Sequence, residues 1–194
     1  MCDLTLSCQC GTVKGIAKTV TPSSSNRVVC YCSDCQAFAR ELGAEDRVLN
    51  EFGGTQLFQL APARVQLTQG HDHIACLHIS EKGTFRWYAA CCNTPIGNTV
   101  SPKFPMIGLI HAFVETDMET KAEDLGPVRA HCQTQYAWDN WPSDQKRNAF
   151  PLGMTLRLMG LVLSWKLRGR GNPNPLFTEA GAPIAQPRKV ERKA

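Results

Sequence analysis

The sequence predicts a mainly β fold of antiparallel sheets, with one C-terminal helix and an extended arm. Short runs rich in β-branched and aromatic residues alternate with turn residues, a spacing that is typical of antiparallel β domains. One later segment, residues 150–171, is instead apolar at helical spacing. The chain has 194 residues and is 43% hydrophobic. One domain with an appendage can therefore bury a core without disulfides.

The expected strands follow one another along most of the chain, each bounded by glycine, proline or polar turn residues. They lie within residues 11–20, 55–60, 64–70, 74–79, 84–90 and 106–116. A short helix is expected within 36–52, which is rich in helix formers and ends before Gly53 and Gly54. Residues 120–130 have the composition of a polar loop.

Residues 150–171 are expected to form a helix that is apolar around most of its circumference. At 100° per residue, one narrow polar stripe runs along it, made by Gly153, Arg157, Gly160, Ser164 and Arg168. The apolar part of the segment, from Leu152 to Trp165, is interrupted by Arg157 and is shorter than the roughly 20 residues that a membrane-spanning helix needs. Two placements remain open. The helix packs against the β domain or a second subunit, which would give a homo-oligomer, or it lies at a membrane surface, helped by Lys166, Arg168 and Arg170.

The charge of the chain changes sign near residue 145. Residues 1–145 contain 11 Lys and Arg against 15 Asp and Glu, a net of −4, whereas residues 146–194 contain 10 against 2, a net of +8. We therefore expect a domain over 1–145 and a basic appendage over 146–194, which consists of the helix and a loosely attached, Pro-rich arm. The basic segment offers contacts to an anionic partner, either nucleic acid or lipid headgroups.

The start of the sequence has no basic stretch followed by an apolar run, so it does not have the pattern of a signal peptide. We therefore expect a cytoplasmic protein in reducing surroundings. Ten cysteines in that setting are expected to bind metal or take part in redox chemistry rather than to form disulfides.

Seven of the ten cysteines lie in three close groups: Cys8 with Cys10, Cys30 with Cys32 and Cys35, and Cys91 with Cys92. Zinc binds thiolates at about 2.3 Å in a tetrahedron, and close pairs on turns supply two ligands each. We predict that these groups hold one to two zinc ions per chain. Cys76 and Cys132 stand alone and are expected to be buried small side chains.

Three ordered motifs resemble those of the glutathione-dependent formaldehyde-activating enzymes, a family that includes centromere protein V. They are SCQCGTV at 7–13, CYCSDC at 30–35 and CCNTP at 91–95, within a similarity that spans roughly residues 6–142. The resemblance implies a β-tent zinc-binding fold with two zinc sites. Cys8 and Cys10 would join the third motif at a structural zinc. Cys30, Cys32 and Cys35 would hold a second zinc whose fourth position is open to a thiol or water.

The third motif departs from the family's pattern, C-x-x-C-G-[ST]-P. When residues 93–95 are aligned with its last three positions, Cys92 takes the final cysteine and Ala89 takes the one three residues earlier. Cys91 is then the candidate for the fourth ligand. Adjacent residues on an extended chain point to opposite faces, so a local distortion is needed for Cys91 and Cys92 to bind together.

The resemblance implies carbon–sulfur lyase chemistry on the adduct of an aldehyde with a small thiol such as glutathione. Zinc on three thiolates would hold the thiol sulfur as thiolate beside the carbonyl group. The competing prediction is a non-enzymatic zinc-binding protein whose basic tail contacts an anionic partner.

The sequence does not identify catalytic residues. Asp34, between two of the thiols, is a candidate acid or base, with a supporting contact to the metal ligands as the alternative. His131 is suggested by the family's strand near the end of the domain, and a structural role explains it as well. His71, His73 and His78 form a further set that a solvated loop and strand face explain equally well.

Overall fold

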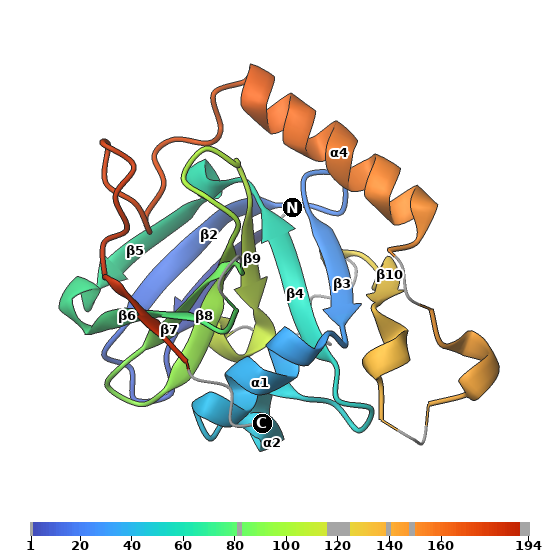
Figure 1. Ribbon diagram of the computed structural model, residues 1–194. Helices are drawn as coiled ribbons and strands as arrows, with labels where there is room; N and C mark the ends of the chain where they lie inside the picture. The colour runs from blue at the N-terminus through green and yellow to red at the C-terminus, as the bar shows by residue number, and fades with distance from the viewer. Residues whose placement is uncertain (1, 81–82, 116–124, 139–140, 148–149, 191–194) are drawn as a thin grey trace.

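The structure is a computed structural model that describes residues 2–80, 83–115, 125–138, 141–147 and 150–190. Two sheets build it (Figure 1). A three-stranded sheet has the order β1-β2-β5, and an eight-stranded sheet has the order β10-β3-β4-β9-β8-β7-β6-β11. The prediction of a mainly β fold with a C-terminal helix and an extended arm is confirmed.

The small sheet consists of β1 (Cys2–Ser7), β2 (Lys14–Val20) and β5 (Val65–Gln69). The large sheet consists of β3 (Asn26–Cys30), β4 (Thr55–Leu60), β6 (Ile74–His78), β7 (Phe85–Ala89), β8 (Thr94–Thr99), β9 (Ile107–Ile110), β10 (Ala130–Cys132) and β11 (Pro187–Lys189). The α-helices are α1 (Ser33–Glu41), α2 (Glu45–Val48) and α4 (Leu152–Leu167). Single 3-10 turns occur at Pro62–Arg64, His71–His73, His111–Phe113, Thr134–Tyr136 and Ser143–Gln145.

Each of the six expected strand segments contains a strand, although residue 116 and residues 120–124 of the polar loop expected over 120–130 lie outside the described residues. The strand pattern missed β1, β3, β8, β10 and β11, although the family resemblance suggested a strand at His131. In β1 the alternation of buried Leu4 and Leu6 with exposed neighbours is short, and β8 contains Pro95 and Gly97, which lower its strand propensity. The helix expected within 36–52 begins earlier, at Ser33, because the Cys32 sulfur accepts the Cys35 N–H and caps it.

Both edges of the large sheet pair in parallel, which differs from the expected antiparallel arrangement. β10 runs parallel to β3 with Cys132 opposite Cys30, and β11 runs parallel to β6 with Pro187 opposite Cys76. Each edge strand has three residues and comes from a distant part of the chain. Long connections of this kind are what parallel pairing requires.

Two apolar clusters hold the layers together. The larger cluster lies between the two sheets and includes Leu4 and Leu6 of the small sheet with Phe58 and Trp87 of the large one. The second cluster lies where α1 packs on the large sheet, and Phe38 is buried there beside thiols that the sequence analysis selected. The cysteine motifs are therefore built on the sheets and on α1.

The C-terminal arm is attached more firmly than the sequence suggests. Leu176 and Phe177 are 2% and 5% exposed and belong to the core between the sheets. The Phe177 ring meets Phe85 and Trp87 edge to face, with centroids 5.2 and 5.5 Å apart. Apolar burial thus fixes an arm whose proline content indicated a loose segment. The division of the chain at residue 145 stays a prediction.

The inner side of α4 packs across the ends of the large-sheet strands. Val162 and Trp165 contact Ala61 and Met106 in one apolar cluster. The predicted polar stripe does not simply face water, because the Arg157 guanidinium donates to the carbonyl oxygens of two residues between β2 and β3, Pro22 and Ser25. Among the described residues, no helix has both the length and the apolar character to cross a membrane.

Replacement of Phe177 by alanine tests the attachment of the arm. We expect Phe177→Ala to lower the free energy of unfolding by about 3–5 kcal/mol, because it removes a buried aromatic side chain from the core. Ile184→Ala, at a half-exposed position on the same arm, should change it by only about 0.5 kcal/mol. Urea unfolding followed by tryptophan fluorescence measures both. Equal small effects would show that the arm does not contribute to the core.

Candidate metal centres

The first candidate centre begins in the turn between β1 and β2. The turn is closed by the Cys8 N–H, which donates to the Val13 carbonyl oxygen at 2.9 Å, and Gly11 adopts a φ of +75°, which favours glycine. The Gln9 N–H donates to the Thr94 hydroxyl at 3.0 Å. This bond ties the turn of the small sheet to the first residue of β8 in the large one.

The second half of the centre is the turn between β7 and β8. Residues 90–93 form this turn, and Asn93 has a φ of +54°. Cys91 and Cys92 therefore do not lie on an extended strand, and their side chains are not forced to opposite faces. The turn supplies the local distortion that the sequence analysis required for Cys91.

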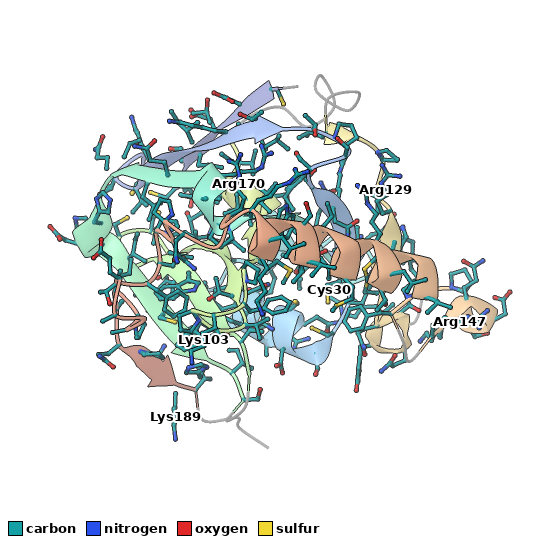
Figure 2. All side chains as sticks on the ribbon, turned by 90° about the horizontal axis from the view of Figure 1, so that it is seen from above. Cys30, Lys103, Arg129, Arg147, Arg170 and Lys189 are labelled. Carbon is teal, nitrogen blue, oxygen red and sulfur yellow. The ribbon has the colours of Figure 1, made fainter. Side chains whose placement is uncertain are left out.

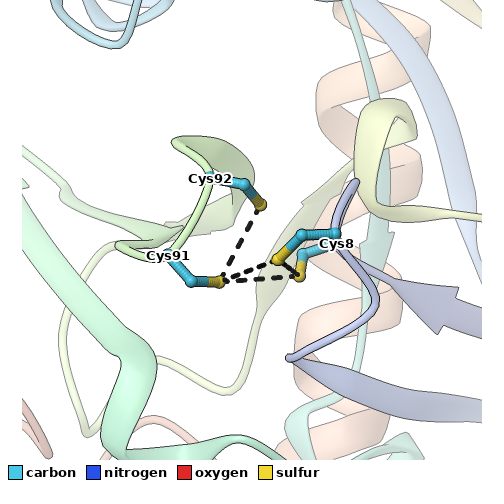
Figure 3. A group of neighbouring side chains, drawn as sticks. Cys8, Cys91 and Cys92 are labelled. Atoms are coloured by element: carbon cyan, nitrogen blue, oxygen red, sulfur yellow. Dashed lines mark hydrogen bonds between the residues drawn. The ribbon is translucent and has the colours of Figure 1, made fainter.

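The four thiols of these two turns converge (Figure 3). The sulfur of Cys91 lies 3.8 Å from that of Cys8, 3.3 Å from that of Cys10 and 3.9 Å from that of Cys92, and the sulfurs of Cys8 and Cys10 are 3.6 Å apart. All four atoms lie within 4.8 Å of one another. A tetrahedron with zinc–sulfur bonds of about 2.3 Å has sulfurs about 3.8 Å apart. The spacing of the thiols therefore fits one tetrahedral metal ion.

The thiols of this centre ionise unequally. Cys10 is exposed, and hydrogen bonds with Thr12, whose hydroxyl lies 3.2 Å from the sulfur, lower its pKa to about 6. Partial desolvation, together with the sulfur contacts to Cys10 and Cys8, raises the pKa of Cys91 to about 12, although its side chain is exposed. A cleft of about 650 Å³ lies beside Cys8 and Cys10, and its charged lining residues are Lys14, Arg47 and Glu115. The two cations favour thiolates there, and the Glu115 carboxylate opposes them.

The second candidate centre lies where β3 leads into α1. Cys30 ends β3, Cys32 caps the helix, and Cys35 lies in its first turn. The three sulfurs lie within 4.8 Å of one another. Backbone N–H groups at a helix N-terminus carry partial positive charge, which stabilises thiolates. The C-x-C-x-x-C spacing brings three thiols together through a strand end and a single helical turn.

A buried arginine contacts this group. Arg86 on β7 is 4% exposed, and its Nη1 donates to the Cys35 sulfur at 3.5 Å. Its Nη2 lies 3.9 Å from Asp34 Oδ2, and its guanidinium stands 5.7 Å from the centroid of the Phe38 ring. An arginine cannot shed its charge, so its burial requires negative charge nearby. The thiols and Asp34 can supply that charge.

The three thiols of the second centre share one small volume and also differ in pKa. Hydrogen bonds from its neighbours Cys30 and Cys32, with the charge of Arg86, hold the pKa of Cys35 well below its usual range. The same sulfur contacts, together with burial, raise the pKa of Cys30. Cys30 and Cys35 are buried, whereas Cys32 is partly exposed. Cys32 is therefore the most exposed of the three.

Other residues that the sequence analysis considered lie apart from the thiols or support them. Asp34 accepts from the Ser80 hydroxyl at 3.3 Å as well as pairing with Arg86. The His131 ring is 3.0 Å from the Tyr31 hydroxyl through Nδ1 and occupies the register position of Val29, one residue away from that of Cys30. Neighbouring positions of a strand face opposite sides of the sheet, so His131 points away from the three thiols.

The remaining candidates do not join a metal group among the described residues. His71 and His73 are exposed on a 3-10 turn, and the His78 ring packs on Phe85 with centroids 4.6 Å apart. Cys76 is buried, as expected for a stray thiol. The buried Cys132 stands opposite Cys30 in the strand pairing, yet it lies outside the group of three mutually close sulfurs.

Sequence reasoning missed Arg86 and Thr94. Arg86 is 51 positions from Cys35, and nothing near it in the sequence marks it as a partner of the thiols. Thr94 follows Cys92 by two residues, and its hydroxyl lies 3.1 Å from that sulfur. The Thr of the third motif was the signal that could have identified it. Whether the seven cysteines bind a metal stays a prediction, but the structure brings them into two groups that are suited to do so.

Comparison with known proteins gives a family and a distant structural neighbour. Residues 2–188 match DUF6151, described as a family of unknown function. No curated protein matches the chain. A crystal structure of a Rhodobacter sphaeroides protein, a Northeast Structural Genomics target, is 14% identical over 66% of this chain and 99% of that chain, with a TM-score of 0.44.

Alkylation tests the unequal thiols of the first centre. The protein is first reduced and stripped of metal, and far-UV circular dichroism shows that it has stayed folded. Because the pKa of Cys10 is lowered to about 6 and that of Cys91 is raised to about 12, Cys10 is thiolate above about pH 6 while Cys91 stays protonated. At about pH 7, iodoacetamide should therefore modify Cys10 at least tenfold faster than Cys91, although both are exposed. The Cys10 rate should level off above about pH 7, whereas the Cys91 rate keeps rising. Peptide mass spectrometry reads both rates, and equal rates would contradict the assignment.

Proposed function

This chain belongs to the DUF6151 family, and we propose that it is a zinc protein that acts on the carbon–sulfur bond between a small thiol and an aldehyde. In this proposal, Cys8, Cys10, Cys91 and Cys92 hold a structural zinc, and Cys30, Cys32 and Cys35 hold a second zinc with one open position. The observation that carries the proposal is the difference between the two groups: four convergent thiols in one and three in the other.

Zinc is supported by the donor sets. All seven side chains are thiols, which are soft ligands that select zinc over magnesium, calcium or manganese. The sulfur spacings of 3.3–3.9 Å in the first group agree with a tetrahedron of zinc–sulfur bonds. All of these cysteines are free thiols. Four thiolates close a tetrahedron, which is typical of structural sites, whereas three leave a position, which is typical of catalytic ones.

The residues around the second group suit the binding of a small thiol. When bound there, zinc would supply a Lewis-acidic position that keeps an incoming thiol in its thiolate form. Arg86 offsets the negative charge of the thiolates, so a further anionic sulfur is tolerated in a buried site. Partly exposed Cys32 leaves a side open to solvent. Asp34 acts by orienting Arg86 and not as the acid or base.

The reaction class follows from holding a thiolate. In the forward direction the thiol sulfur bonds to the carbonyl carbon of the aldehyde, the carbonyl π bond opens, and the oxygen takes the proton that the thiol released. The reverse direction cleaves the carbon–sulfur bond. Neither direction needs a protein nucleophile. The resemblance of motifs 7–13, 30–35 and 91–95 to the glutathione-dependent formaldehyde-activating enzymes supports glutathione as the type of thiol. The ten free cysteines support a reducing, cytoplasmic location.

A second candidate is a non-enzymatic zinc protein. The burial of Cys30 and Cys35 favours it, because closed structural sites are commonly buried and Cys132 stands next to Cys30 across the strand pairing. In that case the protein would use its two metal centres for stability alone.

Metal analysis and cobalt substitution separate the two candidates. We expect two zinc ions per freshly reduced chain. In the cobalt form, glutathione should change the visible spectrum of the second centre, because a thiolate enters its open position. The apparent dissociation constant should fall about tenfold per pH unit below the pKa of the thiol, since binding releases one proton. S-methylglutathione cannot become a thiolate and should leave the spectrum unchanged.

Cysteine variants locate the change. Cys32→Ser should abolish the response to glutathione, whereas Cys76→Ala, at a buried thiol outside both centres, should retain it. A cobalt spectrum that already shows four protein thiolates at each centre, and that responds to glutathione only after Cys132→Ala, would establish Cys132 as the fourth ligand. The enzyme proposal would then be wrong.

Arg86→Gln tests the role of the buried cation. We expect zinc at the second centre to bind 10- to 100-fold more weakly in this variant, a typical loss when a group that contacts a metal ligand is removed. The physical reason is that three close thiolates lose the charge that offsets their repulsion. Competition with a chromophoric chelator measures the affinity, and the zinc at the first centre should be unaffected.

Arg27→Gln is the matched control. Like Arg86, Arg27 lies over an aromatic ring, 5.8 Å from the centroid of Phe58, and its side chain is partly buried. It should leave both zinc affinities unchanged. Arg86→Lys keeps the charge and should recover part of the loss. If Arg86→Gln and Arg27→Gln weaken zinc binding equally, the effect is a general loss of stability and Arg86 has no specific role.

A further inference from the structure

The helix α4 carries two apolar strips on opposite sides. The inner strip packs on the large sheet through Met154, Val162 and Trp165, which are buried. The outer strip is exposed and consists of Leu152, Leu156, Met159, Leu163 and Leu167, each between 55% and 78% exposed. At 100° per residue, the outer residues fall within about 80° of one another, and the centre of the outer strip lies about 140° around the helix from that of the inner strip. Among the described residues, nothing covers them.

An uncovered strip of this size indicates a binding surface. Exposed apolar residues scattered singly are ordinary, but a continuous row marks a site of interaction. A helix that is apolar on both sides is normally buried on both. Phe150, just before the helix, is also exposed. Something outside this chain is therefore expected to contact the outer strip.

The charge around the strip is basic. α4 contains no acidic residue, and Lys166, Arg168 and Arg170 are exposed at its C-terminal end. Figure 2, which views the molecule from the side of α4, shows Arg170 at that end, Arg129 beside the helix and Arg147 beyond its N-terminal end. A surface that joins an apolar row to surrounding cations is complementary to an anionic, partly apolar partner.

A second copy of the chain fits this surface less well. A helix of 16 residues is about 24 Å long and about 10 Å wide, so its outer side offers roughly 240 Å² in projection. Stable interfaces bury about 800 Å² per partner. In an antiparallel pair the basic C-terminal end of one α4 would also face the basic residues near the N-terminal end of the other. Nucleic acid offers phosphates that would pair with the cations, but it offers little apolar surface for a row of leucines.

We propose that the outer strip of α4 docks on an anionic lipid surface, with its leucines in the boundary between headgroups and acyl chains and its basic residues on the headgroups. This proposal is independent of the proposed carbon–sulfur chemistry, since it uses no cysteine of either metal centre. The helix would lie in the plane of the surface with its inner strip still packed on the protein. Apolar burial and charge attraction act together, so each is expected to be necessary.

Co-sedimentation with vesicles tests the proposal on the full zinc-loaded chain. The protein should bind vesicles that contain phosphatidylglycerol and should not bind vesicles of phosphatidylcholine alone. Binding should fall at about 1 M salt, where the Debye length is about 3 Å. Lys166→Glu combined with Arg168→Glu should weaken binding to the anionic vesicles tenfold or more. Leu156→Asp combined with Leu163→Asp should abolish it, because both charges enter the apolar strip.

Val100→Asp is the control, since it places the same charge on an exposed apolar residue that is not part of α4. It should bind vesicles as the wild type does. All of these positions are exposed, so the melting temperature should change little in every variant. Wild-type protein that ignores anionic vesicles, or a double-Asp variant that still binds them, overturns the proposal. A dimer in analytical ultracentrifugation that the double-Asp variant converts to a monomer, without vesicle binding in the wild type, would assign the strip to a second copy.

Discussion

The junction between the two sheets is the constraint on which the rest of the structure depends. The turn that carries Cys8 and Cys10 belongs to the small sheet, and the turn that carries Cys91 and Cys92 belongs to the large one. Eighty-three positions separate Cys8 from Cys91, so their approach closes a long loop at a large cost in chain entropy. Apolar burial between the sheets offsets part of that cost, and one metal ion on four thiolates would offset more. With the junction fixed, β7 is fixed as well, and β7 carries the arginine that reaches the other centre.

The sequence predicts some strands and one group of thiols well, and it predicts other parts of the fold poorly. Six strands were identified from β-branched runs, and the C-x-C-x-x-C group was identified from spacing alone, because a strand end and one helical turn bring its thiols together locally. The parallel edge strands β10 and β11 could not be found in this way. Each has three residues, and its partner lies far away in the sequence. Local propensity carries little information about such pairings.

The missed contacts share one cause, which is that they form between elements and not within them. Cys91 was expected as the fourth ligand, but only with a local distortion of the chain, and the sequence did not show that the turn at Asn93 provides it. The burial of Phe177 depends on Phe85 and Trp87 on another strand. In α4 the helical period was plain, but the pattern could not tell which apolar strip would meet the sheet. Arg157 helped to decide it by binding two carbonyl oxygens of the protein rather than water.

The buried guanidinium of Arg86 gives the strongest physical reason to regard Cys30, Cys32 and Cys35 as an anionic group. Its Nε has no hydrogen-bond partner, and Asp34 is 3.9 Å away, so one carboxylate at that distance is weak compensation for a cation that is 4% exposed. Three neutral thiols would leave most of the desolvation cost of Arg86 unbalanced. Three thiolates on a divalent cation carry a net charge of −1, which balances the +1 charge of Arg86. The group as a whole then has a net charge of −1, which lies on the Asp34 carboxylate at the partly exposed edge of the site. A fourth thiolate on that metal, from the protein or from a small thiol, would add a second negative charge beside the one arginine among the groups described. A protein thiolate would keep that charge in the site permanently, whereas a small thiol leaves when it takes up a proton. The charge balance around Arg86 therefore favours an exchangeable fourth ligand over a fixed one.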